Sequence, residues 1–92
     1  SFKHRGVLGM GVAKDYRGMG LGERLARATI SQAHLHRLER VELLVFGANL
    51  RARKLYGKLG FIEEETKKNA RKLDGVYDDV IEMVLFLEDY VA

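Results

Sequence analysis

The sequence contains no cysteine, which excludes disulfide bonds and thiolate metal sites and suits a reducing, intracellular setting. It also lacks an apolar run approaching the ~20 residues that a membrane-spanning helix needs. No charged-then-apolar start typical of a secretory signal is visible. We therefore expect a cytoplasmic protein without a membrane partner.

The chain has 92 residues, enough for one small domain, and we treat residues 1–92 as a single unit. Hydrophobic residues make up 47% of it, which argues for a packed core and against disorder. The first residue is Ser1 and a strand pattern follows soon after it. This start is typical of a chain whose beginning lies elsewhere, although a processed or engineered start would look the same.

The positive charge is concentrated in the first part of the chain. Residues 1–58 carry 12 Lys and Arg against 4 Asp and Glu, whereas residues 59–92 carry 4 against 9. A basic front half suits an anionic ligand such as a nucleotide phosphate. Solvated helix faces would account equally well for any single cation. Because no basic cluster is interleaved with aromatic residues, nucleic acid is the weaker interpretation.

Hydrophobic periodicity and turn residues predict a mixed α/β domain in the order β-α-β-α-β-β. Gly9 and Gly11 inside the first strand indicate a bulge or the close approach of a ligand. The second strand is almost wholly apolar, which predicts that it is covered on both faces. The expected elements are a strand at Val7–Ala13, a helix from Leu21 to about Leu38, a strand at Val41–Phe46, a helix between the N-cap Asn49 and Gly60, and strands at Phe61–Lys72 and Val76–Glu88 joined by an Asp74–Gly75 turn.

The segment Arg17–Gly22 lies between the first strand and the first helix and reads Arg-Gly-Met-Gly-Leu-Gly. The first turn of a helix leaves backbone N–H groups unpaired at its positive end, and glycines let a phosphate approach them. Arg17 can add a charged contact. The spacing fits neither the dinucleotide-binding fingerprint nor a P-loop, so the glycines alone also allow an ordinary flexible loop.

A second motif, Asn49–Phe61, carries an asparagine, then Tyr56, then a Leu-Gly-Phe turn into the next strand. Together with Arg-x-x-Gly-x-Gly after a strand, it resembles the Gcn5-related N-acetyltransferase (GNAT) family over roughly residues 6–88. The resemblance implies the acyl-CoA N-acyltransferase fold without its N-terminal strands and helices. It also implies transfer of an acetyl group from acetyl-CoA to a primary amine of a small molecule or protein, with no metal.

The resemblance also implies which residues bind acetyl-CoA. Backbone groups of the first strand would pair with the pantetheine arm, amides of the glycine-rich loop would hold the pyrophosphate, and an asparagine would contact the arm. These cofactor-binding residues are Gly11, Val12, Arg17, Gly18, Met19, Gly20, Leu21, Gly22 and Asn49.

Tyr56 has two interpretations. Its spacing from Ala52, Leu55 and Leu59 is that of a core stripe, so packing alone explains it. The resemblance implies that it protonates the leaving thiolate as the catalytic general acid. No general base stands out, since Glu42 and His4 are in reach but suit a surface role. His34 and His36 face different ways on a helix and do not form a metal pair.

The family's fold has further strands and helices ahead of this segment. The first strand would otherwise expose an apolar edge. We therefore expect either a missing N-terminal half or a second copy that makes a homodimer along this edge.

Three other function classes stay open at this stage. A non-catalytic acyl-CoA-binding or regulatory module would bind acetyl-CoA without turnover. A nucleotide-binding βαβ fragment would let ATP or NAD compete with acetyl-CoA. A nucleic-acid-binding protein would lose affinity steeply with salt.

Overall fold

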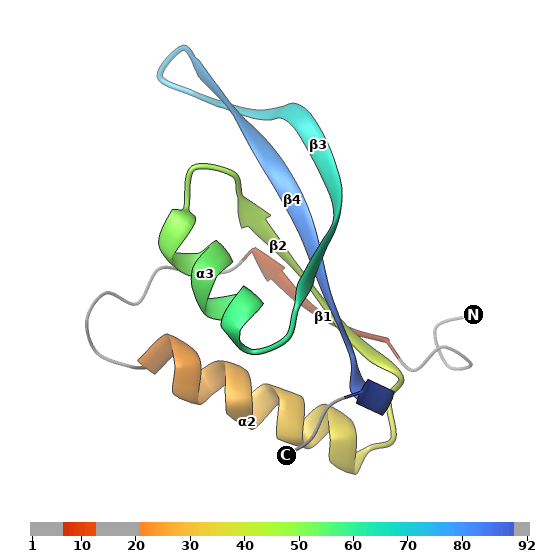
Figure 1. The fold of residues 1–92 in the computed structure, drawn as a ribbon. Helices are drawn as coiled ribbons and strands as arrows, with labels where there is room; N and C mark the ends of the chain where they lie inside the picture. Colours follow the sequence, from red (N-terminus) through yellow and green to blue (C-terminus); the bar gives the residue numbers. More distant parts are fainter. Residues whose placement is uncertain (1–6, 13–20, 90–92) are drawn as a thin grey trace.

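The computed structural model describes residues 7–12 and 21–89. The predicted β-α-β-α-β-β order is confirmed, with a short 3-10 turn, η1, added after the last strand (Figure 1). The elements are β1 (Val7–Val12), α2 (Leu21–Leu35), β2 (Arg40–Phe46), α3 (Leu50–Lys58), β3 (Ile62–Leu73), β4 (Val76–Phe86) and η1 (Leu87–Asp89).

The strands form one four-stranded mixed sheet in the order β1-β2-β4-β3. β1 runs parallel to β2, and β4 lies between β2 and β3 and pairs antiparallel with both. The second half of β4 is nearly all apolar, as suits a strand in the middle of a sheet. The parallel strands β1 and β2 run in the same direction, and α3 begins directly after the end of β2 (Figure 1).

Both helices pack on one face of the sheet and bury a single hydrophobic core. Alternate residues of β2 and β4 point into it, because side chains of a strand alternate between the two faces. The buried core residues are Ala26, Ile30, Ala33, Val41, Leu43, Val45, Ala52, Tyr56, Leu59, Phe61, Ile81, Met83, Leu85 and Leu87. Neither described helix is long and apolar enough to cross a membrane.

The opposite face of the sheet carries no helix among the described residues, and we call it the open face. The prediction that β2 is covered on both faces is wrong for this part of the chain, since Leu44 and Phe46 are only half-buried there. The apolar run of β2 did not distinguish a strand with one covered face from a strand with two. Polar side chains can therefore lie on this face of the sheet.

Helix α2 ends at Leu35, about three residues before the predicted end. Arg37 adopts a left-handed φ of 58°, and the amide of Leu38 donates to the carbonyl of Ala33 at 3.0 Å. This bond closes the helix as a Schellman-type cap does. The sequence has no glycine at this position, so the residue types did not indicate where the helix ends.

Helix α3 begins and ends where the sequence predicts. The Asn49 side chain accepts from the amide of Ala52 at 3.1 Å, which is the N-cap bond. Gly60 takes a left-handed φ of 104°, and the amide of Phe61 donates to the carbonyl of Tyr56 at 2.9 Å. These two caps fix the length and direction of the helix that carries Tyr56.

Two glycines at the end of α3 should respond oppositely to alanine. Gly60→Ala should destabilise the chain by about 1–2 kcal/mol because its left-handed φ strains an L residue, and an added Cβ would lie 3.2 Å from Leu85. Gly57→Ala should stabilise it by about 0.5–1 kcal/mol, since the position is helical and open. Urea unfolding of both variants checks this, and equal effects would contradict the cap.

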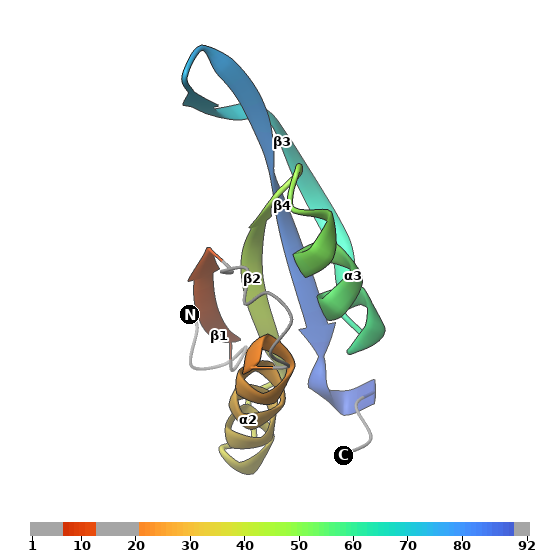
Figure 2. The ribbon, with the colours of Figure 1, turned by 90° about the vertical axis from the view of Figure 1, so that its left-hand side faces the viewer.

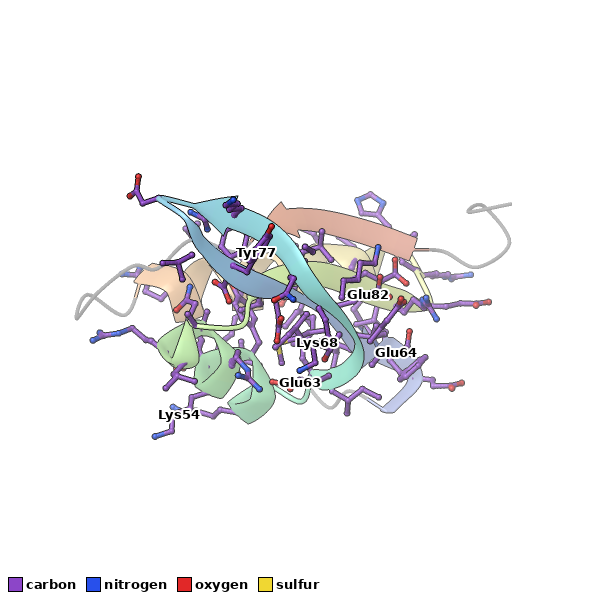
Figure 3. All side chains as sticks on the ribbon, turned by 90° about the horizontal axis from the view of Figure 1, so that it is seen from above. Lys54, Glu63, Glu64, Lys68, Tyr77 and Glu82 are labelled. Carbon is purple, nitrogen blue, oxygen red and sulfur yellow. The ribbon has the colours of Figure 1, made fainter. Side chains whose placement is uncertain are left out.

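Strands β3 and β4 form a long hairpin that extends beyond the helices (Figure 2). Asp74 and Gly75 both take positive φ, 51° and 78°, as the predicted tight turn requires. β3 is an edge strand whose residues 62–70 are all exposed, and most of them are charged (Figure 3). Two register shifts interrupt its pairing, between Glu63 and Glu65 and between Lys67 and Arg71. Charges and bulges of this kind protect an edge from pairing with other chains.

Candidate functional site

Three of the segments predicted to bind a cofactor lie in the described part of the chain. They are the end of β1 with Gly11 and Val12, the start of α2 with Leu21 and Gly22, and the start of α3 with Asn49. The remaining predicted residues lie outside the described part of the chain: Arg17, Gly18, Met19 and Gly20. The ion pair of Glu23 with Lys58 places the start of α2 beside the last turn of α3, so the length of α3 separates the two helix N-termini.

β1 carries the bulge that its glycines indicate. Gly9 pairs with Glu42 and Val12 pairs with Leu44, so β1 uses one residue more than β2 between the two pairs. An extra residue leaves backbone groups of the bulged strand unpaired and re-aims the chain. This irregularity lies at the seam between the two parallel strands, where a ligand's amides can pair with β1.

The first turn of α2 has backbone amides without an intrahelical partner, and amides of this kind can bind an anion. Glu23 lies in this turn and would by itself repel a phosphate. However, Glu23 accepts from Arg27 at 3.2 Å and lies 3.3 Å from the Lys58 Nζ of α3. These hydrogen bonds, from Arg27 first and then Lys58, lower the pKa of Glu23 below its ordinary value. The carboxylate is thus balanced by two cations, and its pairing with Lys58 links the two helices.

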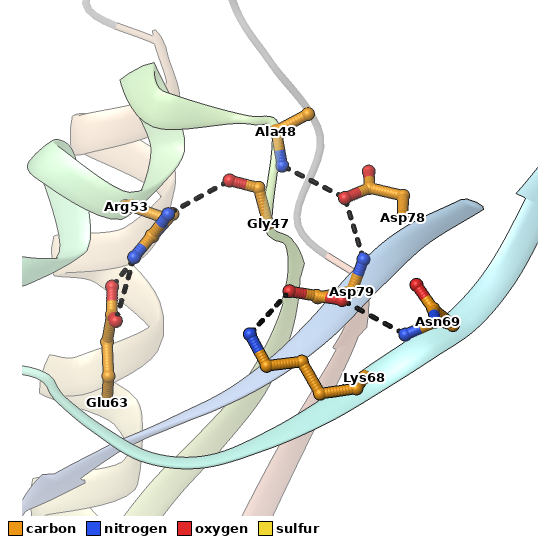
Figure 4. Close-up of polar contacts among 8 residues, drawn as sticks. All are labelled: Gly47, Ala48, Arg53, Glu63, Lys68, Asn69, Asp78 and Asp79. Carbon is orange, nitrogen blue, oxygen red and sulfur yellow. Dashed lines mark hydrogen bonds and ion pairs between the residues drawn. The ribbon is translucent and has the colours of Figure 1, made fainter. Parts of the chain in front are cut away.

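The turn between β2 and α3 is held by one carboxylate and one backbone carbonyl from β4 (Figure 4). The amide of Gly47 donates to the carbonyl of Asp79 at 2.8 Å, and the amide of Ala48 donates to Asp78 Oδ1 at 3.2 Å. A Cβ on Gly47 would lie 3.2 Å from the Cβ of Asp79, so the close approach requires glycine. The turn therefore places the Asn49 cap rigidly beside the sheet.

Arg53 joins this turn to β3. Its guanidinium donates to both carboxylate oxygens of Glu63, at 2.8 and 3.0 Å, and to the carbonyl of Gly47 at 3.0 Å (Figure 4). A two-pronged arginine–carboxylate pair is geometrically more demanding than a single contact. The sequence analysis assigned no role to Arg53. No short-range signal could have indicated one, because its partner is ten residues away on another element.

A second carboxylate of the hairpin, Asp79, is also engaged. Its Oδ1 accepts from the amide of Asn69 at 3.0 Å, and its Oδ2 lies 3.4 Å from Lys68 Nζ (Figure 4). The backbone hydrogen bond from Asn69 is the larger cause that lowers the pKa of Asp79. Asn69 itself has a positive φ of 52°, at the second irregularity of β3. The hairpin thereby buttresses the turn that carries Asn49.

The Arg53–Glu63 pair predicts a pH dependence of stability. The hydrogen bond from Arg53 lowers the pKa of Glu63 below its ordinary value of 4.5. A carboxyl with a depressed folded pKa contributes stability above its unfolded pKa, and that stability is lost as pH falls through the folded pKa. Glu63→Gln should therefore lower the free energy of unfolding by about 1 kcal/mol at neutral pH. The difference should shrink as pH falls below 4.5 and disappear at an acid pH below the folded pKa of Glu63.

Urea unfolding at both pH values measures this difference. The matched control is Glu39→Gln, an exposed carboxylate with no side-chain ion pair among the described residues. A Glu63→Gln effect of equal size at both pH values would contradict the electrostatic origin.

Tyr56 lies two helical turns beyond Asn49 and faces the core, where it is 4% exposed. Its ring meets Phe61 edge-to-face, with centroids 5.5 Å apart and planes at 77°. The core position predicted from its spacing is confirmed. Seven helical residues span ~10 Å, so Tyr56 lies about that far along α3 from the edge of the sheet where α3 begins.

An open depression of about 560 Å³ lies at the same edge. The Arg71 guanidinium covers the Phe46 ring in it, 3.9 Å from the centroid. Its lining residues are Phe46, Ala48, Asn49, Leu50, Arg51, Arg71 and Asp78. The larger depression, about 920 Å³, lies at the opposite edge between the α2–β2 connection and the end of β4. Since that edge holds none of the predicted site residues, size alone does not mark the site.

Metal binding finds no support in the described part of the chain. No group of three or more His, Asp or Glu side chains there could hold a metal ion. His34 is the exposed penultimate residue of α2, and His36 follows the helix and is also exposed. His4 lies outside the described residues, so the structure gives no position for that possible base.

Comparison with known proteins agrees with this geometry. The family model described as the acetyltransferase (GNAT) family matches residues 1–61. The solved ribosomal-protein-S18-alanine N-acetyltransferase from Escherichia coli is similar at 29% identity and a TM-score of 0.74, over 85% of this chain and 49% of its own. A GNAT-family acetyltransferase from Streptococcus pneumoniae is 32% identical with a TM-score of 0.71, over 77% of this chain and 44% of its own.

A Salmonella typhimurium protein solved with its cofactor acetyl-CoA shares the fold, with 23% identity and a TM-score of 0.73 over 84% of this chain and 44% of its own. The chain thus spans less than half the length of each of these structures. The bulged strand, the two helix N-termini and the family match lead to one conclusion: this chain belongs to the acetyltransferase (GNAT) family.

Proposed function

We propose that the chain is the acetyl-CoA-binding part of an N-acetyltransferase that transfers an acetyl group to a primary amine of a small molecule or protein. The observation that carries the proposal is the bulge of β1 at its seam with β2, followed along the chain by the N-terminus of α2. A strand with unpaired backbone groups suits a pantetheine arm, and a helix N-terminus suits a pyrophosphate. The family match supplies the identity of the ligand.

The residues present suit that ligand. Gly11 and Val12 would pair with the amides of the arm, and the amides of Leu21 and Gly22 would complete the anion site. The side-chain carbonyl oxygen of Asn49 accepts a hydrogen bond from the Ala52 amide, so its N–H₂ group can donate to the ligand. In the same proposal, the pyrophosphate is also contacted by four residues outside the described part of the chain: Arg17, Gly18, Met19 and Gly20.

Tyr56 would act as the general acid in this proposal. Its place on α3, inward from Asn49, is where the sulfur end of an arm entering at the helix N-termini would lie. A positioned acid contributes about 10²–10⁴-fold to proton-transfer catalysis. The protein's own contribution is therefore to orient the arm, exclude water from the core side and supply one proton.

Calorimetry with acetyl-CoA, ATP and NAD tests the binding step, and thiol release over a panel of amines tests the transfer. We expect acetyl-CoA alone to bind and thiol to appear only with amine. Binding without turnover would favour an acyl-CoA-binding module. The chain spans less than half the length of the solved structures, which is the reason to test this alternative. Competition by ATP or NAD would contradict the acetyl-CoA site.

The same proposal includes a cytoplasmic location and a partner along the outer edge of β1. β1 ends the described sheet and pairs only with β2 among the described strands. The partner would be a second copy of the chain or the further polypeptide that the longer relatives carry. Solution scattering distinguishes these arrangements, and a monodisperse monomer would contradict the dimer.

A further inference from the structure

The register of the sheet places one carboxylate opposite the cofactor seam. Val12 of β1 pairs with Leu44 of β2, and Leu44 pairs with Glu82 of β4. Adjacent strands lie ~5 Å apart, so Glu82 is about one strand spacing from β2 and two from β1. It is thus in the row of the bulge that the proposed function gives to the cofactor arm.

Glu82 points to the open face of the sheet. Its neighbours Ile81 and Met83 point into the core beneath the helices, and alternation along the strand turns Glu82 to the other side. Tyr56, in contrast, lies on the helix-covered face. In the proposed complex, Tyr56 and Glu82 would therefore approach the acetyl group from different faces of the sheet.

Glu82 is half-buried and makes no hydrogen bond or ion pair with any described residue. Glu42, on the same face, is in contrast ion-paired with Arg40. A half-buried carboxylate without a partner retains the lone pairs that a proton acceptor needs. This difference selects Glu82 over Glu42, which the sequence analysis had named as a guess.

The charged groups around Glu82 favour its proton-accepting role. Burial is the largest cause that raises the pKa of Glu82, followed by the negative charges of Glu42, Glu64 and Glu65. Arg40 acts in the opposite direction. Glu64 lies on the neighbouring strand β3 (Figure 3), and Lys67 pairs with Val80 one row further along the open face. A raised pKa makes a carboxylate a stronger base near neutral pH.

We propose that Glu82 is the general base of the acetyl transfer. This inference rests on the proposed function. Glu82 takes one proton from the acceptor ammonium, directly or through one water molecule. The amine nitrogen forms a C–N bond to the acetyl carbon while the C–S bond breaks. Tyr56 gives a proton to the leaving sulfur and recovers one from the acylated nitrogen, and Glu82 releases its proton to solvent. The net products are amide, thiol and one proton.

The test compares Glu82→Gln, Glu82→Asp and Glu64→Gln with the wild type in the pH dependence of kcat/KM. Glu82→Gln should lower kcat/KM about 100-fold and abolish the acidic limb of the profile. Its acetyl-CoA affinity should be unchanged. Glu82→Asp should restore part of the rate and the limb. Glu64→Gln removes a neighbouring charge without removing the base, so it should keep the rate and move the limb to lower pH.

Carboxyl carbon NMR gives a readout independent of turnover. The pKa of Glu82 in the ligand-free chain should lie above 4.5, coincide with the acidic limb and fall in Glu64→Gln. A pKa at or below that value, or full kcat/KM in Glu82→Gln, overturns the role of Glu82 while wild-type turnover upholds the proposed function. A wild type that acetylates no amine contradicts both. If Glu82→Gln does not fold, the Glu64→Gln shift decides.

Discussion

Replacing Tyr56 with phenylalanine should lower kcat about 100-fold or more while leaving the affinity for acetyl-CoA nearly unchanged. The substitution removes only the hydroxyl proton that the proposed mechanism delivers to the leaving sulfur. The ring is retained, so its edge-to-face contact with Phe61 at 5.5 Å remains. A loss in kcat without a change in binding is what separates a proton donor from a packing residue.

The control for this prediction is Tyr77→Phe, which removes the same hydroxyl from a tyrosine 57% exposed on the hairpin. It should leave kcat, acetyl-CoA affinity and the unfolding midpoint unchanged. Steady-state kinetics and calorimetry on both variants provide the comparison. If Tyr56→Phe keeps the wild-type kcat, Tyr56 is only the core residue that its helical spacing indicates.

Features set by a few neighbouring residues were predictable from the sequence. Asn49 caps α3 through its own side chain, Gly60 supplies a left-handed turn, and Asp74–Gly75 closes a hairpin. Each depends on backbone conformations that only certain residue types favour. The bulge of β1 was similarly indicated by its glycines. These local features delimit the two helix N-termini and the strand end that form the candidate site.

Features set by the pairing of distant elements were not predictable. Arg53 and Glu63 meet because β3 returns past α3, and Glu82 reaches the cofactor row only through the register of β2 with β4. A one-residue change of register would turn Glu82 into the core. The predicted end of α2 was wrong for another reason. Arg37 adopts a left-handed conformation there, and an arginine in a sequence does not indicate such a conformation.

The structure also changes which residues are proposed as the acid and the base. From the sequence, Tyr56 and the cofactor segments were the only site with a role, and the base was missing. The sheet now separates a helix-covered face, which holds Tyr56, from an open face, which holds Glu82. The hairpin is therefore both a buttress for the Asn49 turn and the source of the proposed base. Hairpin substitutions such as Lys68→Ala act through this turn and should change acetyl-CoA affinity more than kcat.

The largest effect on stability should come from Ile30→Ala in α2. Ile30 is 0% exposed and lies in the core between α2 and the sheet. Truncation of such a side chain removes buried methyl groups and leaves a cavity, which costs about 2–5 kcal/mol. Small domains have only about 5–15 kcal/mol of stability, and each kcal/mol lowers the Tm of a domain this size by roughly 4–8 °C.

Leu35→Ala is the matched control, because Leu35 is on the same helix but 72% exposed. It should change the free energy of unfolding by less than about 0.5 kcal/mol. Equal losses in the two variants would contradict the packing of α2 through Ile30. Acetyl-CoA should raise the Tm of Ile30→Ala if the variant still binds it, because a ligand that binds only the folded state stabilises that state. Because the proposed anion site includes the first turn of α2, a ligand bound there should restore the packing of a destabilised α2.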